Sequence, residues 1–210
     1  MAISDKQKQK KLLKKKQKRT AAVKATKVWA TNISPANCAN LPLNDCIVPS
    51  NLFELGIGEV FISRQLPDGN LAVSAFIVDV FCLGVKNALF SVMSGEEYEN
   101  MKEAIVGSGR ELESIQANCA KKLLEGAVEY AKELGFSSHD YYKKALPLFG
   151  NIAASDCSVH YAYGKEGKPF YMRGPNESIR DAEKITATLR KKLGDEGFHY
   201  LIGLDDTAFE

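Results

Sequence analysis

The sequence Gly58-Glu-Val-Phe-Ile-Ser-Arg-Gln-Leu-Pro-Asp-Gly-Asn-Leu-Ala-Val-Ser-Ala-Phe-Ile-Val-Asp-Val-Phe81 decides the fold of this 210-residue chain. Its first part alternates and is rich in β-branched and aromatic residues, which is typical of a strand. Pro67-Asp-Gly-Asn70 then has the composition of a tight turn, and strand character resumes from Leu71 to Phe81. The pattern predicts a β-hairpin. Because the second strand is apolar on both faces from Phe76 onward, we expect it to lie inside a sheet.

Three helices are predicted after this hairpin. Ser94-Gly-Glu-Glu97 has the form of a capping box and predicts a short helix to about Val106. Ser137 or Ser138 begins a helix that ends near Leu148. Between them, apolar residues recur at intervals of three and four and predict the longest helix, which Gly135 ends; they are Leu112, Ile115, Cys119, Leu123, Ala127, Tyr130 and Leu134.

The C-terminal part has a second strand-turn-strand pattern. Val159 to Gly164 and Pro169 to Met172 are predicted to pair as a hairpin, with Gly167 at a turn position that needs positive φ. Asn176 or Ser178 caps a last helix, which reaches about Leu193, and residues 198–203 form a final strand. The order ββααα-ββαβ, with four helices, predicts an α+β domain with mainly antiparallel strands.

The chain divides into three parts by composition. Residues 1–28 are a Lys-rich arm, which we expect to be disordered, and residues 29–56 are rich in Asn, Pro and Cys and predict an irregular lead-in. Residues 57–205 are expected to form a single globular domain. Hydrophobic residues make up 45% of the chain, yet no window holds 18 consecutive apolar residues, so a membrane-spanning helix is not predicted.

Two blocks resemble a family of uncharacterised bacterial proteins. They are Phe76-Ile-Val-Asp-Val-Phe-Cys-Leu-Gly-Val-Lys-Asn-Ala88 and Gly135-Phe-Ser-Ser-His-Asp-Tyr141. A third stretch, Tyr163 to Tyr171, extends the similarity, which spans about residues 38–203. The resemblance implies a bacterial-type cytosolic body and carries no activity or site residues with it.

Charge is strongly segregated along the chain. Residues 1–28 carry eleven Lys or Arg and one Asp, a net charge of +10, whereas the remaining 182 residues carry 17 basic and 25 acidic side chains, a net charge of −8. Dense lysine without an apolar helical face suits the neutralisation of phosphates. The predicted nucleic-acid contacts are Lys6, Lys8, Lys10, Lys11, Lys14, Lys15, Lys16, Lys18 and Arg19.

This segregation favours a non-enzymatic cytoplasmic protein that binds RNA or a ribonucleoprotein, such as the ribosome, through its arm. The acidic body would then be a folded module that is also able to bind a protein partner, and neither a membrane partner nor a cofactor is predicted. Two alternatives stay open. One is a metal-dependent hydrolase or nuclease centred on Asp79, and the other is a protein-interaction subunit whose tail only solubilises it.

Asp79 is the acid on which the nuclease alternative rests. It lies in a predicted interior strand, where a carboxylate needs a partner, and Lys86 or Arg64 are the expected ion-pair partners. Under the alternative, Asp79 would act with Asp140 and His139, with Glu59 and Asp156 as other acids. His139 also suits a local cap at the start of a helix.

The five cysteines have no zinc-type spacing, so no metal site is predicted and free thiols are expected; they are Cys38, Cys46, Cys82, Cys119 and Cys157. Aromatic residues near basic side chains suggest either a surface for stacking bases or part of the core. These are Tyr161, Tyr163, Phe170 and Tyr171, with Lys165, Lys168 and Arg173 beside them.

Overall fold

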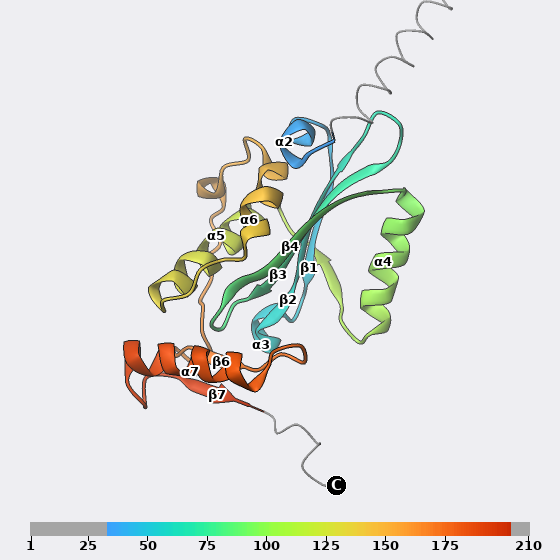
Figure 1. The fold of residues 1–210 in the computed structure, drawn as a ribbon. Coiled ribbons are helices and arrows are strands. Elements are labelled where there is room, and N and C mark those ends of the chain that lie inside the picture. The colour runs from blue at the N-terminus through green and yellow to red at the C-terminus, as the bar shows by residue number, and fades with distance from the viewer. Residues whose placement is uncertain (1–32, 203–210) are drawn as a thin grey trace, which may run out of the picture.

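The computed structural model describes residues 33–202, and its centre is a five-stranded antiparallel sheet (Figure 1). Every neighbouring pair of strands in this sheet is antiparallel. The predicted α+β class is therefore confirmed. In spatial order the strands are β4 (Gly84–Met93), β3 (Leu71–Asp79), β2 (Ile57–Gln65), β1 (Leu43–Pro49) and β5 (Leu112–Ser114).

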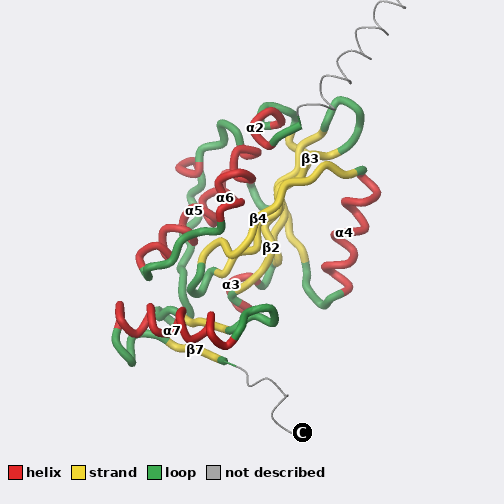
Figure 2. Tube along the Cα trace, in the orientation of Figure 1, coloured by secondary structure: helices red, strands yellow, loops and turns green. Residues whose placement is uncertain are grey.

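Helices cover both faces of the sheet (Figure 2). Helix α4 (Gly95–Gly107) lies on one face, with Tyr98, Met101 and Ile105 against the strands. The opposite face carries α5 (Ala117–Glu133), α6 (Asp140–Ala145) and the 3-10 helix η1 (Leu146–Phe149). The four helices of the prediction are present, and the described residues contain two further short ones, α2 (Pro35–Cys38) and α3 (Leu52–Leu55).

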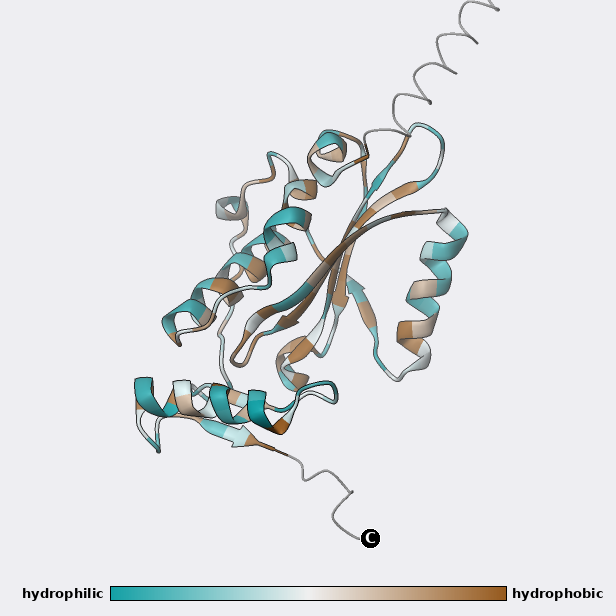
Figure 3. Cartoon of the chain, in the orientation of Figure 1, coloured by the Kyte–Doolittle hydropathy of each residue, from teal (hydrophilic) through white to brown (hydrophobic). Residues whose placement is uncertain are grey.

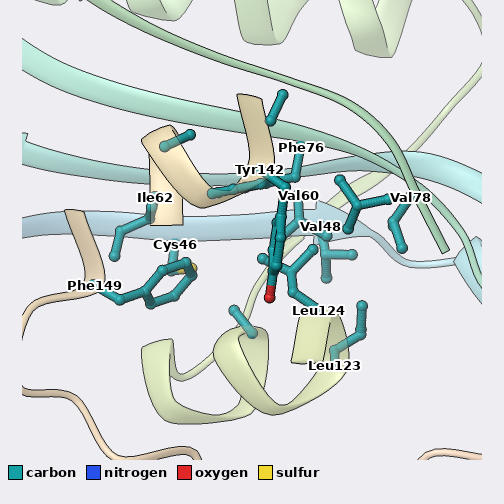
Figure 4. Close-up of a cluster of buried hydrophobic side chains, with 14 of the residues drawn as sticks. Cys46, Val48, Val60, Ile62, Phe76, Val78, Leu123, Leu124, Tyr142 and Phe149 are labelled. Atoms are coloured by element: carbon teal, nitrogen blue, oxygen red, sulfur yellow. The ribbon is translucent and has the colours of Figure 1, made fainter. Parts of the chain in front are cut away.

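The main core lies between the sheet and the layer of α5, α6 and η1 (Figure 4). Phe76 of β3 is fully buried there and contacts the rings of Tyr142 and Phe149 at centroid distances of 6.0 and 6.1 Å. The hydropathy colouring shows the same distribution, with the strands apolar and the outer helix surfaces polar (Figure 3). Burial of this apolar surface is the main stabilising term of the fold.

The predicted hairpin is confirmed, and its second strand has an interior position between β2 and β4. That strand ends earlier than expected, at Asp79 rather than Phe81, because the apolar run turns back on itself and continues as β4. Gly84 begins β4 with φ of +66°, and a Cβ there would lie 2.8 Å from the carbonyl oxygen of Ala127 on α5. Only glycine fits this position without strain.

The lead-in prediction for residues 29–56 is wrong in its described part, and the domain begins well before residue 57. Residues 43–49 form β1, an interior strand between β2 and β5. Its buried side chains Cys46 and Val48 belong to the main core. The prolines made this stretch look irregular in the sequence. Pro42 precedes the strand, and Pro49 is its last residue, where a missing N–H is tolerated.

The helix signals are confirmed in α4, α5 and α7 (Ile179–Leu193), with corrections at the ends. Ser94 and Glu97 form the capping box of α4, and Ser178 caps α7. The long helix begins at Ala117, because residues 112–114 pair with β1 as strand β5 instead. Helix α6 is capped by His139 and not by Ser137 or Ser138, since its Nδ1 accepts a hydrogen bond from the backbone N–H of Tyr141.

The second predicted hairpin does not form. Tyr163 instead lies against α5, where its hydroxyl donates to the carbonyl of Leu123, so residues 159–163 cannot pair with the following strand. Only a turn remains, with Gly167 at φ of +80° as expected. Strand β6 (Phe170–Met172) pairs in parallel with β7 (His199–Leu201), and α7 packs on them as a small C-terminal unit.

Arg64 of β2 joins segments that are far apart in the sequence. The residue is 7% exposed, and its side chain donates hydrogen bonds to three backbone carbonyls, those of Leu41, Leu148 and Phe149. These bonds fix the segment before β1 and the 3-10 helix η1 to the same strand. The guanidinium therefore supplies the polar partners that three carbonyls in the interior require.

Replacing Arg64 by Met should lower the free energy of unfolding by about 2 to 4 kcal/mol, because buried carbonyls lose their donors. The measurement is urea unfolding followed by circular dichroism. Arg110→Met is the matched control, since Arg110 makes a partly exposed ion pair with Glu59, and it should cost less than about 1 kcal/mol. Equal losses in the two variants would contradict the role of Arg64.

Candidate functional site

Asp79 holds the turn between β3 and β4. The residue is 6% exposed, and its Oδ1 accepts hydrogen bonds from the backbone N–H groups of Phe81 and Cys82, both at 2.9 Å. Burial raises the pKa of the Asp79 carboxyl to about 6, although the turn amides and the charge of Lys86 act against this increase. The geometry gives Asp79 a structural function as the acceptor that closes this turn.

The expected ion pair of Asp79 is not formed. Arg64 donates hydrogen bonds to backbone carbonyls, and Lys86 forms a salt bridge with Glu177. Glu177 also accepts from the hydroxyl of Tyr171 at 2.7 Å and from the amide of Gly174 at 3.1 Å. This cluster fastens the C-terminal unit to β4. Lys86 therefore forms its ion pair at that interface and not with Asp79.

The other residues of the nuclease alternative do not converge on Asp79. Glu59 pairs with Arg110, and Asp140 is exposed at the first turn of α6. His139 is an exposed helix cap, as one interpretation of the sequence had it, and Asp156 is an exposed residue of the 3-10 helix η2 (Ala154–Asp156). Within residues 33–202 no three His, Cys, Asp or Glu side chains are grouped so that they could hold a metal ion.

The aromatic cluster near residue 165 is part of the folded interior. Tyr171 is fully buried, and Tyr161 stacks on Phe53 of α3 with a centroid distance of 5.6 Å. Lys165 lies over the ring of Phe170 at 5.0 Å. Since these rings pack against protein groups, the core interpretation is the one that the structure supports.

Helix α6 presents an exposed aromatic and basic face. Tyr141 is 53% exposed and stacks on His139 with a centroid distance of 5.5 Å. The ammonium of Lys144 lies 4.4 Å from the centre of the Tyr141 ring, and Lys143 is exposed beside it. Because His139 and Lys144 already lie against the Tyr141 ring, this face offers a nucleic acid mainly its exposed ammonium groups, which are able to contact phosphates.

Helix α6 is connected through η1 to the first described helix, α2. Helix α2, near the first described residue, packs against η1, which continues α6 directly. Figure 1 shows α2 and α6 on the same side of the sheet and α4 on the other. The predicted arm contacts, Lys6 to Arg19, lie outside the described residues.

A pocket of about 440 Å³ lies at the start of α5. Its walls come from the end of β1, from α3, from β5 and from the segment that follows η2. Its described lining residues are Val48, Pro49, Ser50, Leu52, Phe53, Glu113, Ser114, Ile115, Gln116, Cys119, Leu123, Ser158, Val159 and Tyr161. The volume lies in the range typical of small-molecule sites.

The expectation of free thiols is wrong for two of the five cysteines. Cys119 and Cys157 form a disulfide with a Cα–Cα distance of 5.0 Å, whereas Cys38, Cys46 and Cys82 are free and buried. Sequence reasoning missed the pair because the two residues are 38 positions apart and no spacing motif marks them. Only the packing of the segment after η2 against α5 brings their sulfurs together.

Comparisons with protein-family models, with curated proteins and with solved structures found no match to this chain. None of the helices between residues 33 and 202 is long and apolar enough to cross a membrane. Interpretation of function therefore rests on the charges, the surfaces and the pocket of the chain itself.

The raised pKa of Asp79 predicts a characteristic pH dependence of stability. The folded protein binds the Asp79 proton more tightly than the unfolded chain, so the contribution of Asp79 to stability is largest below about pH 4 and is lost as the pH rises through about 6. Asp79→Asn lacks this titration. The difference in the free energy of unfolding between wild type and Asp79→Asn should therefore fall by up to about 3 kcal/mol from about pH 4 to about pH 7.

Urea unfolding of both proteins across this pH range provides the measurement. Asp79→Ala is the companion variant, because it also removes the acceptor of the turn and should be about 2 to 4 kcal/mol less stable than Asp79→Asn at every pH. Parallel stability curves for wild type and Asp79→Asn would show that the carboxyl does not titrate in this range.

Proposed function

We propose that this protein is a non-enzymatic RNA or ribonucleoprotein binding protein that contacts phosphates through its N-terminal Lys arm. The observation that carries the proposal is the charge segregation, +10 in residues 1–28 and −8 in the rest. A lysine tract needs no defined geometry to neutralise phosphates, because each contact releases condensed counterions. Binding of this kind is strong at low salt and poor in sequence preference.

The described body supports an oriented contact. Helix α4 carries exposed glutamates on one side of the sheet, at positions 96, 97, 99 and 103. Phosphates are repelled from that side. On the other side, the aromatic and basic face of α6 is connected through η1 to α2, near the first described residue. We therefore expect a nucleic acid held by the arm to extend along α6. The acidic α4 side then stays available to a basic protein partner, as in a ribonucleoprotein assembly.

The arm should carry most of the affinity for RNA. A variant that begins at Val28 keeps every described residue and loses all eleven basic residues of the arm, of which Lys27 is the last, together with Asp5. Binding of the intact chain to single-stranded RNA should weaken by about 10³-fold or more between roughly 50 and 200 mM salt, whereas the truncated variant should bind weakly at both. Fluorescence anisotropy at several salt concentrations measures this dependence.

Equal affinity of the truncated and intact proteins at both salt concentrations would contradict the proposal. Circular dichroism of the truncated variant confirms that the body is folded in the same samples. The RNA is also examined for cleavage in Mg²⁺, and it should stay at full length. Cleavage that disappears in a folded Asp79→Asn protein would instead support the hydrolase alternative.

The α6 face should add a smaller contribution. The double variant Lys143→Gln/Lys144→Gln should bind RNA more weakly than the wild type and should reduce the salt slope by about 1 to 2. Lys191→Gln/Lys192→Gln is the matched control, because it removes the same charge from exposed positions of α7. If both double variants lose affinity equally, only net charge matters and the oriented contact is refuted.

A further inference from the structure

The disulfide joins two elements that meet at the pocket. Cys119 is the third residue of α5, and Cys157 directly follows η2. Their exposed fractions are 6% and 3%, so neither sulfur lies on the open surface. Cys119 nevertheless lines the pocket, and Cys157 does not. A reagent that enters the pocket therefore reaches Cys119 before Cys157.

A helix N-terminus and a lysine lie next to the two cysteines. Cys119 lies in the first turn of a 17-residue helix, where the helix dipole favours negative charge, and its backbone N–H donates to the side-chain oxygen of Asn118 at 2.9 Å. The ammonium of Lys122 donates to the backbone carbonyl of Cys157 at 2.8 Å, which places a positive charge at the second cysteine. Among the free cysteines, burial raises the pKa of Cys46 to about 12, so a thiol that is only buried resists ionisation.

We propose that the Cys119–Cys157 pair is a thiol–disulfide exchange site that reacts with a low-molecular-weight thiol bound in the pocket. The pocket volume of about 440 Å³ admits a small molecule and excludes a folded protein domain. This inference is independent of the proposed RNA binding, since it concerns a different surface and different residues.

The exchange is balanced in two steps. The thiolate of the incoming thiol attacks Sγ of Cys119, a mixed disulfide forms on Cys119, and Cys157 leaves as a thiolate beside Lys122. A second thiol then attacks the mixed disulfide at the sulfur of the small molecule and releases Cys119. Two small thiols are oxidised to one small disulfide, the protein disulfide gains two electrons, and the two thiol protons are transferred to Cys119 and Cys157 or to solvent.

Reduction should leave the fold intact. The segment around η2 is also held by Lys121, which donates to the carbonyl of Ile152 at 2.8 Å, and by Lys122. Tyr161 stays stacked on Phe53 beyond it. What changes is the covalent tie between α5 and a wall of the pocket, which includes Ser158 and Val159.

Single cysteine variants of the full chain test which sulfur reacts. Cys157→Ser leaves Cys119 as a thiol at the pocket, and Cys119→Ser leaves Cys157 away from it. The probe is 2-hydroxyethyl disulfide, a neutral reagent, because Glu113 is the charged residue among the described lining of the pocket. We expect the mixed disulfide to form at least about tenfold faster in Cys157→Ser.

Intact-mass spectrometry follows the reaction, and peptide mapping locates the adduct. The three buried free cysteines are internal controls and should stay unmodified in the folded protein. Equal rates in the two variants, or modification only in denaturant, would overturn the assignment. Five alkylated thiols in the oxidised wild-type protein would overturn it as well, because the pair would then not be a disulfide.

A pair of lysine variants tests the wild-type disulfide without removing a cysteine. Lys122→Met should slow reduction by 2-mercaptoethanol about three- to tenfold, because the leaving thiolate of Cys157 loses its positive neighbour. Lys121→Met is the matched control, since it removes the same kind of carbonyl contact one residue earlier and away from the cysteine. Equal reduction rates in the two variants would contradict the role of Lys122 and the assignment of Cys157 as leaving group.

Discussion

The buried guanidinium of Arg64 is the contact on which the arrangement of this fold most depends. A charge in the interior is costly unless it is hydrogen-bonded, and each of the three nitrogens of the Arg64 guanidinium donates to a backbone carbonyl, those of Leu41, Leu148 and Phe149. Those carbonyls belong to the segment before β1 and to η1, so one side chain of β2 holds two segments that are far apart in the sequence. Burial also lowers the pKa of Arg64, yet an arginine remains charged at any physiological pH.

A second constraint acts at the opposite end of the same strands. Asp79 closes the turn between β3 and β4, and Gly84 lets β4 pass close to α5. Lys86, two residues further on, then anchors Glu177 and with it the C-terminal unit. The acid that looked catalytic in the sequence is therefore part of a chain of contacts that places α7 and its strands against the main sheet.

The molecule combines two chemically separate features. The basic arm and the face of α6 suit phosphates, and both depend on exposed, solvated charge. The pocket beside the disulfide differs from them, because it is a cavity with a mixed apolar and polar lining that includes the buried Cys119. The two features share no described residue, because the pocket is lined by residues within 48–53, 113–123 and 158–161 and the α6 face consists of residues 139–144. Their tests can therefore succeed or fail separately.

Local signals in the sequence determined the first hairpin, the capping box of α4, the N-cap and C-terminal end of α7, and most of the long helix, because caps, turns and periodicity act within a few residues. The sequence also determined the charge segregation, on which the proposed RNA contact rests. Only the tertiary structure decided that residues 43–49 form an interior strand, that residues 112–114 leave the helix pattern to pair with them, and that Tyr163 packs on α5 instead of extending a hairpin. The same holds for the partners of Asp79 and for the joining of Cys119 to Cys157. The physical reason is that each of these contacts joins residues that are far apart in the sequence or that have several possible partners. Packing decides which partner each residue contacts, and no local sequence pattern encodes that choice.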